Sequence, residues 1–222
     1  VIKGEIKTLT DQLMSDYCKF CETHYDKNGI SPISNQYEGI YCSSITNSVD
    51  KKSSNKFEPF LYVNLEINDL NENDSIFQSL ESFTNPEQLT DFKDADYQLD
   101  TTFNKQVRFL KLPNNLTIVL KRFKFNMETM KPYKIDISLK FPTTLDMSPF
   151  TIGYANKYTQ YELYAICNHQ GNLDHGHYYS FVKNFNNEWV LFNDRNFKEI
   201  SKDMMDREQL FSKDAYILFY RL

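Results

Sequence analysis

The stretch that decides the fold is YELYAICNHQGNLDHGHYYSFVKNFNNEWVLFND, Tyr161 to Asp194. Three runs rich in aromatic and branched residues, Tyr161 to Cys167, His177 to Lys183 and Trp189 to Phe192, lie between segments that carry turn signals. This pattern predicts three strands. The stretch also holds three of the chain's four histidines and one of its four cysteines within eleven residues. Such clustering is compatible with a metal cage or with part of an active site.

The catalytic interpretation follows from hairpin geometry. A turn centred near Phe185 to Asn187 sets His177 opposite residues 194 to 196, with Asn193 within diagonal reach. A histidine general base needs a third group that fixes its orientation, and an amide or carboxylate serves this purpose in thiol proteases. We therefore expect His177, Asn193 and the adjacent Asp194 to act together.

The nucleophile of such a site is missing. Cys167 lies next to the histidines but in the middle of a predicted strand, where packing is its expected role. Cys18 has no glycine or asparagine nearby to form an oxyanion site. Neither cysteine is expected to be the nucleophile.

Two metal sites are the alternatives to this catalytic interpretation. Cys167, His169, His175 and His177 have zinc-type donors, but their spacing matches no familiar zinc motif. The pair Cys18-x-x-Cys21 lies on a predicted helix and has no second pair to complete a site. We expect no metal and no cofactor.

The composition bounds the class of protein. The 222 residues are 41% hydrophobic and 15% aromatic, enough for the core of one large domain or two small ones. The net charge of −5 argues weakly against nucleic acid. No run approaches the roughly 20 apolar residues of a membrane span. Four cysteines without disulfide-type spacing favour a reducing compartment, the cytoplasm or nucleus.

The rest of the chain predicts an α+β architecture whose C-terminal half is rich in strands. Apolar residues from Ile6 to Tyr25 recur at helical spacing, and Asn28-Gly29 and Ser31-Pro32 signal turns. A second helix is expected from Ser75 to Phe83, with Ile76, Phe77, Leu80 and Phe83 facing inward. The polar tract from Thr46 to Lys56 is expected to be a loop. The remaining predicted strands are Ile40 to Ile45, Phe60 to Ile67, Val107 to Leu112, Leu116 to Phe125, Ile135 to Phe141 and Ala215 to Arg221.

Six linked motifs over about 110 residues resemble the ubiquitin-specific proteases in order and spacing. They are Leu112-Pro113-x-x-Leu116-x-Ile118-x-Leu120-Lys121-Arg122-Phe123, Phe141-Pro142-x-x-Leu145-Asp146, Tyr161-x-Leu163 with Asn168-His169-x-Gly171, Gly176-His177-Tyr178, Trp189-x-x-Phe192-Asn193-Asp194 and Asp214-Ala215-Tyr216-x-Leu218-x-Tyr220. The looser upstream resemblance, which includes Phe57-Glu58-Pro59-Phe60 and Ser75-Ile76-Phe77-x-Ser79, is closest to the herpesvirus-associated member of that family.

The resemblance implies a papain-like cysteine protease fold of the ubiquitin-specific protease type, shaped like a right hand. Residues 1–30 would be the last thumb helix, 36–125 mainly the fingers, and 126–222 the palm. It implies His177 as the general base, Asn193 as its orienting partner, and Asp194 as the adjacent polar residue that some members use instead or as well. Tyr178, Gly176 and His169 would bind the ubiquitin tail. Met130 to Ile137 and His169 to His175 would be loops that close over that tail, with His169 and His175 as solvated or hydrogen-bonded loop residues.

The departures from the family pattern shape the functional expectation. The second Cys-x-x-Cys pair of zinc-binding fingers, expected near Tyr97 to Thr102, is absent, which predicts zinc-free fingers. The Gly-x-x-Asn-x-Gly-Asn-Thr-Cys box with the nucleophile is absent too. We interpret the chain as the C-terminal part of a deubiquitinating thiol protease that is inactive alone and whose partners are ubiquitin, ubiquitinated proteins and an upstream segment with the box. The alternative is a catalytically dead ubiquitin-binding scaffold.

Overall fold

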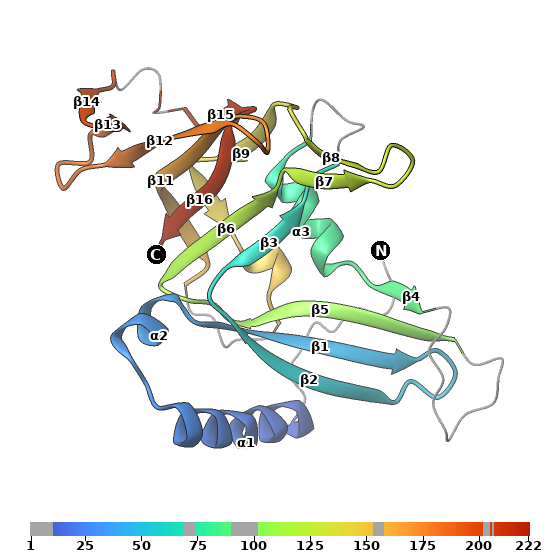
Figure 1. Cartoon of the computed structure of the whole chain (residues 1–222). Helices are drawn as coiled ribbons and strands as arrows, with labels where there is room; N and C mark the ends of the chain where they lie inside the picture. The colour runs from blue at the N-terminus through green and yellow to red at the C-terminus, as the bar shows by residue number, and fades with distance from the viewer. Residues whose placement is uncertain (1–10, 69–73, 90–101, 153–157, 202–204, 206) are drawn as a thin grey trace. The chain divides into compact units, whose positions relative to one another are not determined.

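The structure, a computed structural model, describes residues 11–68, 74–89, 102–152, 158–201, 205 and 207–222, which form two compact units (Figure 1). The first unit comprises the described residues within Val1–Leu61, Ser82–Pro113 and Ser148–Tyr158. The second comprises those within Tyr62–Glu81, Asn114–Met147 and Thr159–Leu222. Helices together with mainly antiparallel sheets confirm the predicted α+β class.

The first unit is built on a four-stranded sheet with strand order β2-β1-β5-β4. Its elements are α1 (Asp11–Asn28), α2 (Pro32–Tyr37), β1 (Gly39–Asn47), β2 (Ser53–Phe60), β4 (Glu87–Leu89), β5 (Phe103–Lys111) and the 3₁₀ helix η1 (Ser148–Phe150). The apolar face predicted for the first helix is confirmed where it is described, because Tyr17 and Phe20 pack on Phe57 of β2 with ring centroids 5.7 and 5.6 Å away. Ile6 and Leu9 lie outside the described residues.

The second unit is built on an eight-stranded sheet with order β14-β13-β12-β11-β16-β6-β3, in which β10 also pairs with β11. Two-stranded sheets β15-β9 and β7-β8 accompany it. The strands are β3 (Val63–Glu66), β6 (Asn115–Lys121), β7 (Phe123–Asn126), β8 (Lys131–Lys134), β9 (Leu139–Pro142), β10 (Thr144–Asp146), β11 (Gln160–Gly171), β12 (Gly176–Lys183), β13 (Trp189–Asn193), β14 (Asn196–Glu199), β15 (Gln209–Ser212) and β16 (Ala215–Arg221). Helix α3 (Ile76–Thr84) begins in this unit.

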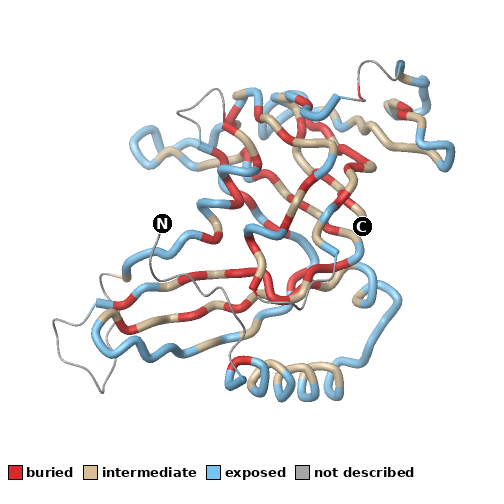
Figure 2. Tube along the Cα trace, turned by 180° about the vertical axis from the view of Figure 1, so that it is seen from behind, coloured by how far each residue is buried: buried red, intermediate tan, exposed pale blue. Residues whose placement is uncertain are grey.

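Buried residues follow the strands of each unit, as the red segments of Figure 2 show. In the central strands of the second unit, Ile118, Leu163 and Leu218 are fully buried. Among the described residues, no helix is long and apolar enough to cross a membrane.

The polar tract expected to be a loop is largely strand. Strand β1 continues to Asn47 and β2 starts at Ser53, so only a short turn separates them. Cross-strand hydrogen bonds between polar side chains replace apolar contacts: Ser44 Oγ donates to Asn55 Oδ1 at 2.6 Å, and the Thr46 and Ser53 hydroxyls lie 2.9 Å apart. The prediction from composition was therefore wrong here.

Two other turn predictions also need correction. The Ser31-Pro32 signal starts helix α2, which Ser31 caps by accepting a hydrogen bond from the Ser34 amide. The segment Met130 to Ile137, expected to be a loop, supplies strand β8 of a hairpin with β7. Met130 at the hairpin's turn has a φ of 52°.

Several strand and helix predictions hold only in part. The strand expected from Phe60 to Ile67 is interrupted at Leu61 and Tyr62. Residues 135–138 are not in a strand, which starts only at Leu139. Helix α3 is confirmed, with the Ser75 hydroxyl accepting from the Gln78 amide, but Phe77 is 41% exposed instead of facing inward.

The strand predicted from Leu116 to Phe125 is broken at Arg122, which leaves the β6 ladder. Its guanidinium is fully buried and donates to the carbonyls of Ala215, Ile135, Ile137 and Ser212 at 2.5 to 3.0 Å. Burial lowers the pKa of Arg122 to about 10, so the group stays charged at neutral pH. Arg122 therefore ties the segments before β9 and β16 to the end of β6.

Candidate functional site

The hairpin β12-β13 places His177 beside Asn193. Its register pairs Ser180 with Phe192 and Lys183 with Trp189, and Asn184 Oδ1 closes the turn by accepting from the Asn186 and Glu188 amides at 2.9 Å. His177 Nε2 then lies 2.6 Å from Asn193 Oδ1. The pairing expected from hairpin geometry is thus present in the structure.

The contact between these side chains fixes which imidazole nitrogen is basic. An amide oxygen only accepts hydrogen bonds, so Nε2 of His177 is the donor to Asn193 Oδ1. Nδ1 of the neutral ring then carries the lone pair. The arrangement can accept a proton at Nδ1 while Asn193 keeps the ring in one orientation.

Asp194 does not share in this contact. It follows β13 with a φ of 51°, and in the described part of the chain it makes no hydrogen bond to His177. The neutral amide of Asn193, not a carboxylate, is therefore the partner of the imidazole.

His169 is not a loop residue, because β11 continues to Gly171. It pairs with Tyr178 across the β11-β12 ladder and is only 4% exposed. Its amide donates to the Asp214 carbonyl at 2.8 Å, and its carbonyl accepts from Lys134 Nζ at 2.7 Å. The prediction of a loop residue is therefore wrong for His169. Of its two alternatives, solvated or hydrogen-bonded, the backbone hydrogen bonds fit the second.

Tyr178 and His175 do lie at the surface. Tyr178, the residue after His177 in the sequence, is 54% exposed. His175 is exposed in the turn after Gly171, where its amide donates to Asn172 Oδ1 at 2.8 Å. Of the predicted tail-binding residues, Tyr178 and Gly176 are thus accessible and His169 is covered.

The cysteines do not provide a thiol next to His177 in the second unit. Cys167 pairs with Ser180 and His177 pairs with Gln170, so the two side chains leave opposite faces of the sheet. Burial raises the pKa of the Cys21, Cys42 and Cys167 thiols, which opposes thiolate formation. No group of three or more His, Cys, Asp or Glu side chains among the described residues is placed to share a metal ion, so the zinc cage is not formed.

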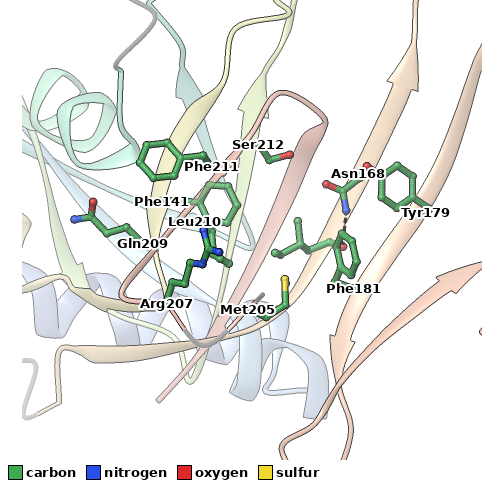
Figure 3. Close-up of a pocket in the computed structure, with 11 residues that line it drawn as sticks. Phe141, Asn168, Tyr179, Phe181, Met205, Arg207, Gln209, Leu210, Phe211 and Ser212 are labelled. Carbon is green, nitrogen blue, oxygen red and sulfur yellow. Dashed lines mark hydrogen bonds between the residues drawn. The ribbon is translucent and has the colours of Figure 1, made fainter. Parts of the chain in front are cut away.

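A pocket of about 200 Å³ lies beside β11, β12 and the β9-β15 sheet (Figure 3). Tyr179 and Phe181 lie two and four residues after His177 on β12, so the three side chains share one face of the sheet. Tyr179 and Phe181 line the pocket together with Phe141 and Leu210 of the β9-β15 sheet. The carboxamide of Asn168 is buried in its wall and donates to the Ile166 carbonyl at 3.5 Å. Nothing in the sequence pointed to this pocket, because β15, which contributes to its lining, lies about thirty residues after β12.

Lys134 and Tyr216 also belong to the site and carried no role in the sequence interpretation. Lys134 has a side chain only 4% exposed and lies 3.4 Å from the Asp136 carboxylate. The ring centroid of Tyr216 lies 6.3 Å from that of Tyr178. The available sequence signals were a lysine at the end of one strand, Lys134, and an aromatic residue near the start of another, Tyr216. Neither residue type indicates which distant part of the sequence it will contact.

Comparisons with known proteins show which family the chain belongs to. The family model described as ubiquitin carboxyl-terminal hydrolase matches residues 6–220. Ubiquitin carboxyl-terminal hydrolase 21 of Arabidopsis thaliana is 40% identical over 183 residues, which cover 81% of this chain and 23% of that protein. Ubiquitin carboxyl-terminal hydrolase 8 of Saccharomyces cerevisiae is 32% identical over 198 residues, which cover 84% of this chain and 40% of that protein.

Among solved structures, the SAGA Ubp8/Sgf11/Sus1/Sgf73 DUB module bound to ubiquitin aldehyde superposes with a TM-score of 0.74 at 27% identity. The match covers 95% of this chain and 48% of the solved chain. The chain thus spans less than half the length of these relatives. With a family model matched over nearly its whole length, the chain belongs to the ubiquitin carboxyl-terminal hydrolase family.

Proposed function

We propose that the chain is the fingers and palm of a ubiquitin-specific thiol protease that hydrolyses the isopeptide or peptide bond after the terminal glycine of ubiquitin. In this proposal residues 1–30 are the last thumb helix, 36–125 mainly the fingers and 126–222 the palm. The observation that carries it is the 2.6 Å contact between His177 Nε2 and Asn193 Oδ1, which leaves Nδ1 as a base. Family membership and a solved relative bound to ubiquitin aldehyde support the choice of substrate.

In the proposed reaction, His177 Nδ1 takes the proton of a cysteine thiol supplied by a segment upstream of this chain. The thiolate attacks the carbonyl carbon, and the resulting intermediate expels the substrate amine, which receives the proton from His177. The acyl-enzyme is a thioester with the ubiquitin terminus. His177 then removes a proton from water, which attacks the thioester, and ubiquitin leaves with a free carboxylate.

Asn193 would hold the ring through both proton transfers. A neutral amide orients the imidazole without placing a negative charge beside it. Asp194 remains proposed as the residue that could orient the imidazole of His177 in place of Asn193 or together with it. Tyr178 and Gly176 would contact the ubiquitin tail directly, while His169, being covered, would contribute to tail binding only through Tyr178.

The proposal includes the cytoplasm or nucleus as location, fingers without zinc, and no cofactor. All four cysteines are free thiols, which is compatible with a reducing compartment. The second Cys-x-x-Cys pair was expected near Tyr97 to Thr102, and of this range only Thr102 lies within the described residues.

The test is turnover of a fluorogenic ubiquitin C-terminal amide by the full-length protein that contains this chain. We expect His177→Ala to lower kcat/KM by at least about 10³-fold, because the base is lost. Lys198→Ala is the control, since this exposed residue of β14 has no role in the proposed site, and its activity should equal that of the wild type. Activity of His177→Ala within about tenfold of the wild type would reject the role of His177.

A wild-type protein that binds ubiquitin without hydrolysing it would favour the alternative, a ubiquitin-binding scaffold with this fold. The raised pKa values of Cys21, Cys42 and Cys167 are the observation that keeps this alternative open.

A further inference from the structure

Gly176 lacks a side chain because of His169, not because of its own backbone. The positive-φ glycines of the described residues are Gly29 and Gly171, so Gly176 has a backbone that any residue can adopt. A Cβ atom at Gly176 would overlap Nε2 of the His169 imidazole and lie 2.8 Å from its Cε1 and 3.0 Å from its Cδ2. The ring of His169 therefore fills the space where a side chain at position 176 would lie.

The ring of His169 has little freedom to move away. It packs edge-on against Phe123 with ring centroids 5.4 Å apart, and against Tyr178 and Tyr216 at 4.7 and 6.4 Å. Hydrogen bonds from its amide to Asp214 and from Lys134 to its carbonyl hold its backbone at both sides. Three aromatic rings and two hydrogen bonds thus lock the residue.

The environment of His169 favours a packing role over proton transfer. Its Nδ1 is buried without a hydrogen-bond partner in the described part of the chain. Burial, reinforced by the nearby Lys134 ammonium, lowers the pKa of His169 below its usual value. The imidazole is therefore neutral at working pH, and His177 alone of the two is placed to exchange protons.

We infer that His169 is a positioning residue: its locked ring sets the place of Gly176 and Tyr178 and thereby aims His177 at Asn193. The functional half of this inference rests on the proposed function. Since Gly176, His177 and Tyr178 are consecutive at the start of β12, any shift that relieves an overlap at Gly176 moves the imidazole of His177. The close contact between Gly176 and His169 then predicts energetic coupling between the two positions.

A double-mutant cycle on Gly176→Ala and His169→Ala tests this coupling. In the full-length protein we expect each single variant to lower kcat by about 10- to 100-fold with a smaller change in KM, because the base is misplaced. In the double variant the added methyl group enters the space left by the ring. We therefore expect the kcat of the double variant to be about that of His169→Ala. It should lie far above the value that results when the two fractional activities are multiplied. Lys198→Ala, at an exposed position of β14 that has no role in the proposed site, is the control.

A second readout requires no activity. In the 222-residue chain, the Nε2–H proton of His177 should give a downfield NMR signal that Gly176→Ala weakens and that the double variant regains. If His169→Ala does not fold, His169→Val completes the cycle, because a β-branched side chain suits a strand and still removes the ring.

An unchanged His177 signal in Gly176→Ala, or additive losses in the double variant, would overturn the inference. Coupling in the NMR signal together with a wild-type protein that has no turnover would reject the proposed function and leave the positioning role of His169 intact.

Discussion

Asn193 Oδ1 accepts a hydrogen bond from His177 Nε2 at 2.6 Å across a hairpin whose turn lies between them. Removing the amide in Asn193→Ala should free the ring to rotate and lower kcat by about 10²- to 10⁴-fold, with a small effect on KM. Steady-state kinetics of the full-length protein measure this. A change below about threefold would mean that Asn193 does not orient the base.

Asn193→Asp should keep the orientation and change the pH dependence. A carboxylate beside Nε2 stabilises the protonated, positively charged form of the imidazole. The acidic limb of the kcat/KM profile of the full-length protein should therefore move to higher pH. An unshifted limb in Asn193→Asp would show that the titrating base is not His177.

Arg122→Ala should destabilise the second unit strongly. The fully buried guanidinium donates to four carbonyls, and its loss leaves those acceptors unpaired, at a cost of about 3 to 5 kcal/mol in the free energy of unfolding. Urea denaturation measures it. The control is the exposed Arg195→Ala, expected to change stability by less than about 0.5 kcal/mol. Equal midpoints for the two variants would contradict this account.

Stability should fall in mild acid because of His169. Its folded pKa is lowered, so the unfolded chain binds more protons once the pH drops below the usual histidine value of about 6.5. The contribution of His169 is therefore complete above that pH and declines below it. The charged groups near the ring are Lys134, Asp136 and Asp214. Urea midpoints at pH 7.5 and 5.5 should differ less for His169→Gln than for the wild type or His175→Ala; identical pH dependences would refute this.

The 222-residue chain alone should not hydrolyse ubiquitin amides, and it should not depend on zinc. We expect no turnover above background with the chain alone, and no change in its unfolding midpoint after chelation. Turnover would place the nucleophile within the chain, and one bound zinc per chain would show that a metal site forms.

Much of the site followed from local sequence. The register of β12 and β13 depends on a tight turn at Asn184 to Glu188, so the distance along the chain was enough to place His177 beside Asn193. Strands β6, β11, β12, β13 and β16 were likewise evident from their branched and aromatic residues, whereas β8, β10, β14 and β15 were not predicted.

What the sequence did not reveal depends on partners far along the chain. The burial of His169 requires Phe123 and Tyr216, which pack on it from β7 and β16. The break at Arg122 is stabilised by carbonyls up to 93 residues away. The polar residues Ser53 and Asn55 of β2 are matched by hydroxyl groups of β1, a complementarity that composition alone does not show.

The most direct test of the central claim uses ubiquitin with a thiol-reactive group at its C-terminus, incubated with the full-length protein and with His177→Ala, followed by mass spectrometry. The account predicts a covalent adduct on one cysteine upstream of Val1 in the wild type and a much slower reaction in the variant. Ubiquitin that binds without forming an adduct, or an adduct formed equally fast in both proteins, would contradict it.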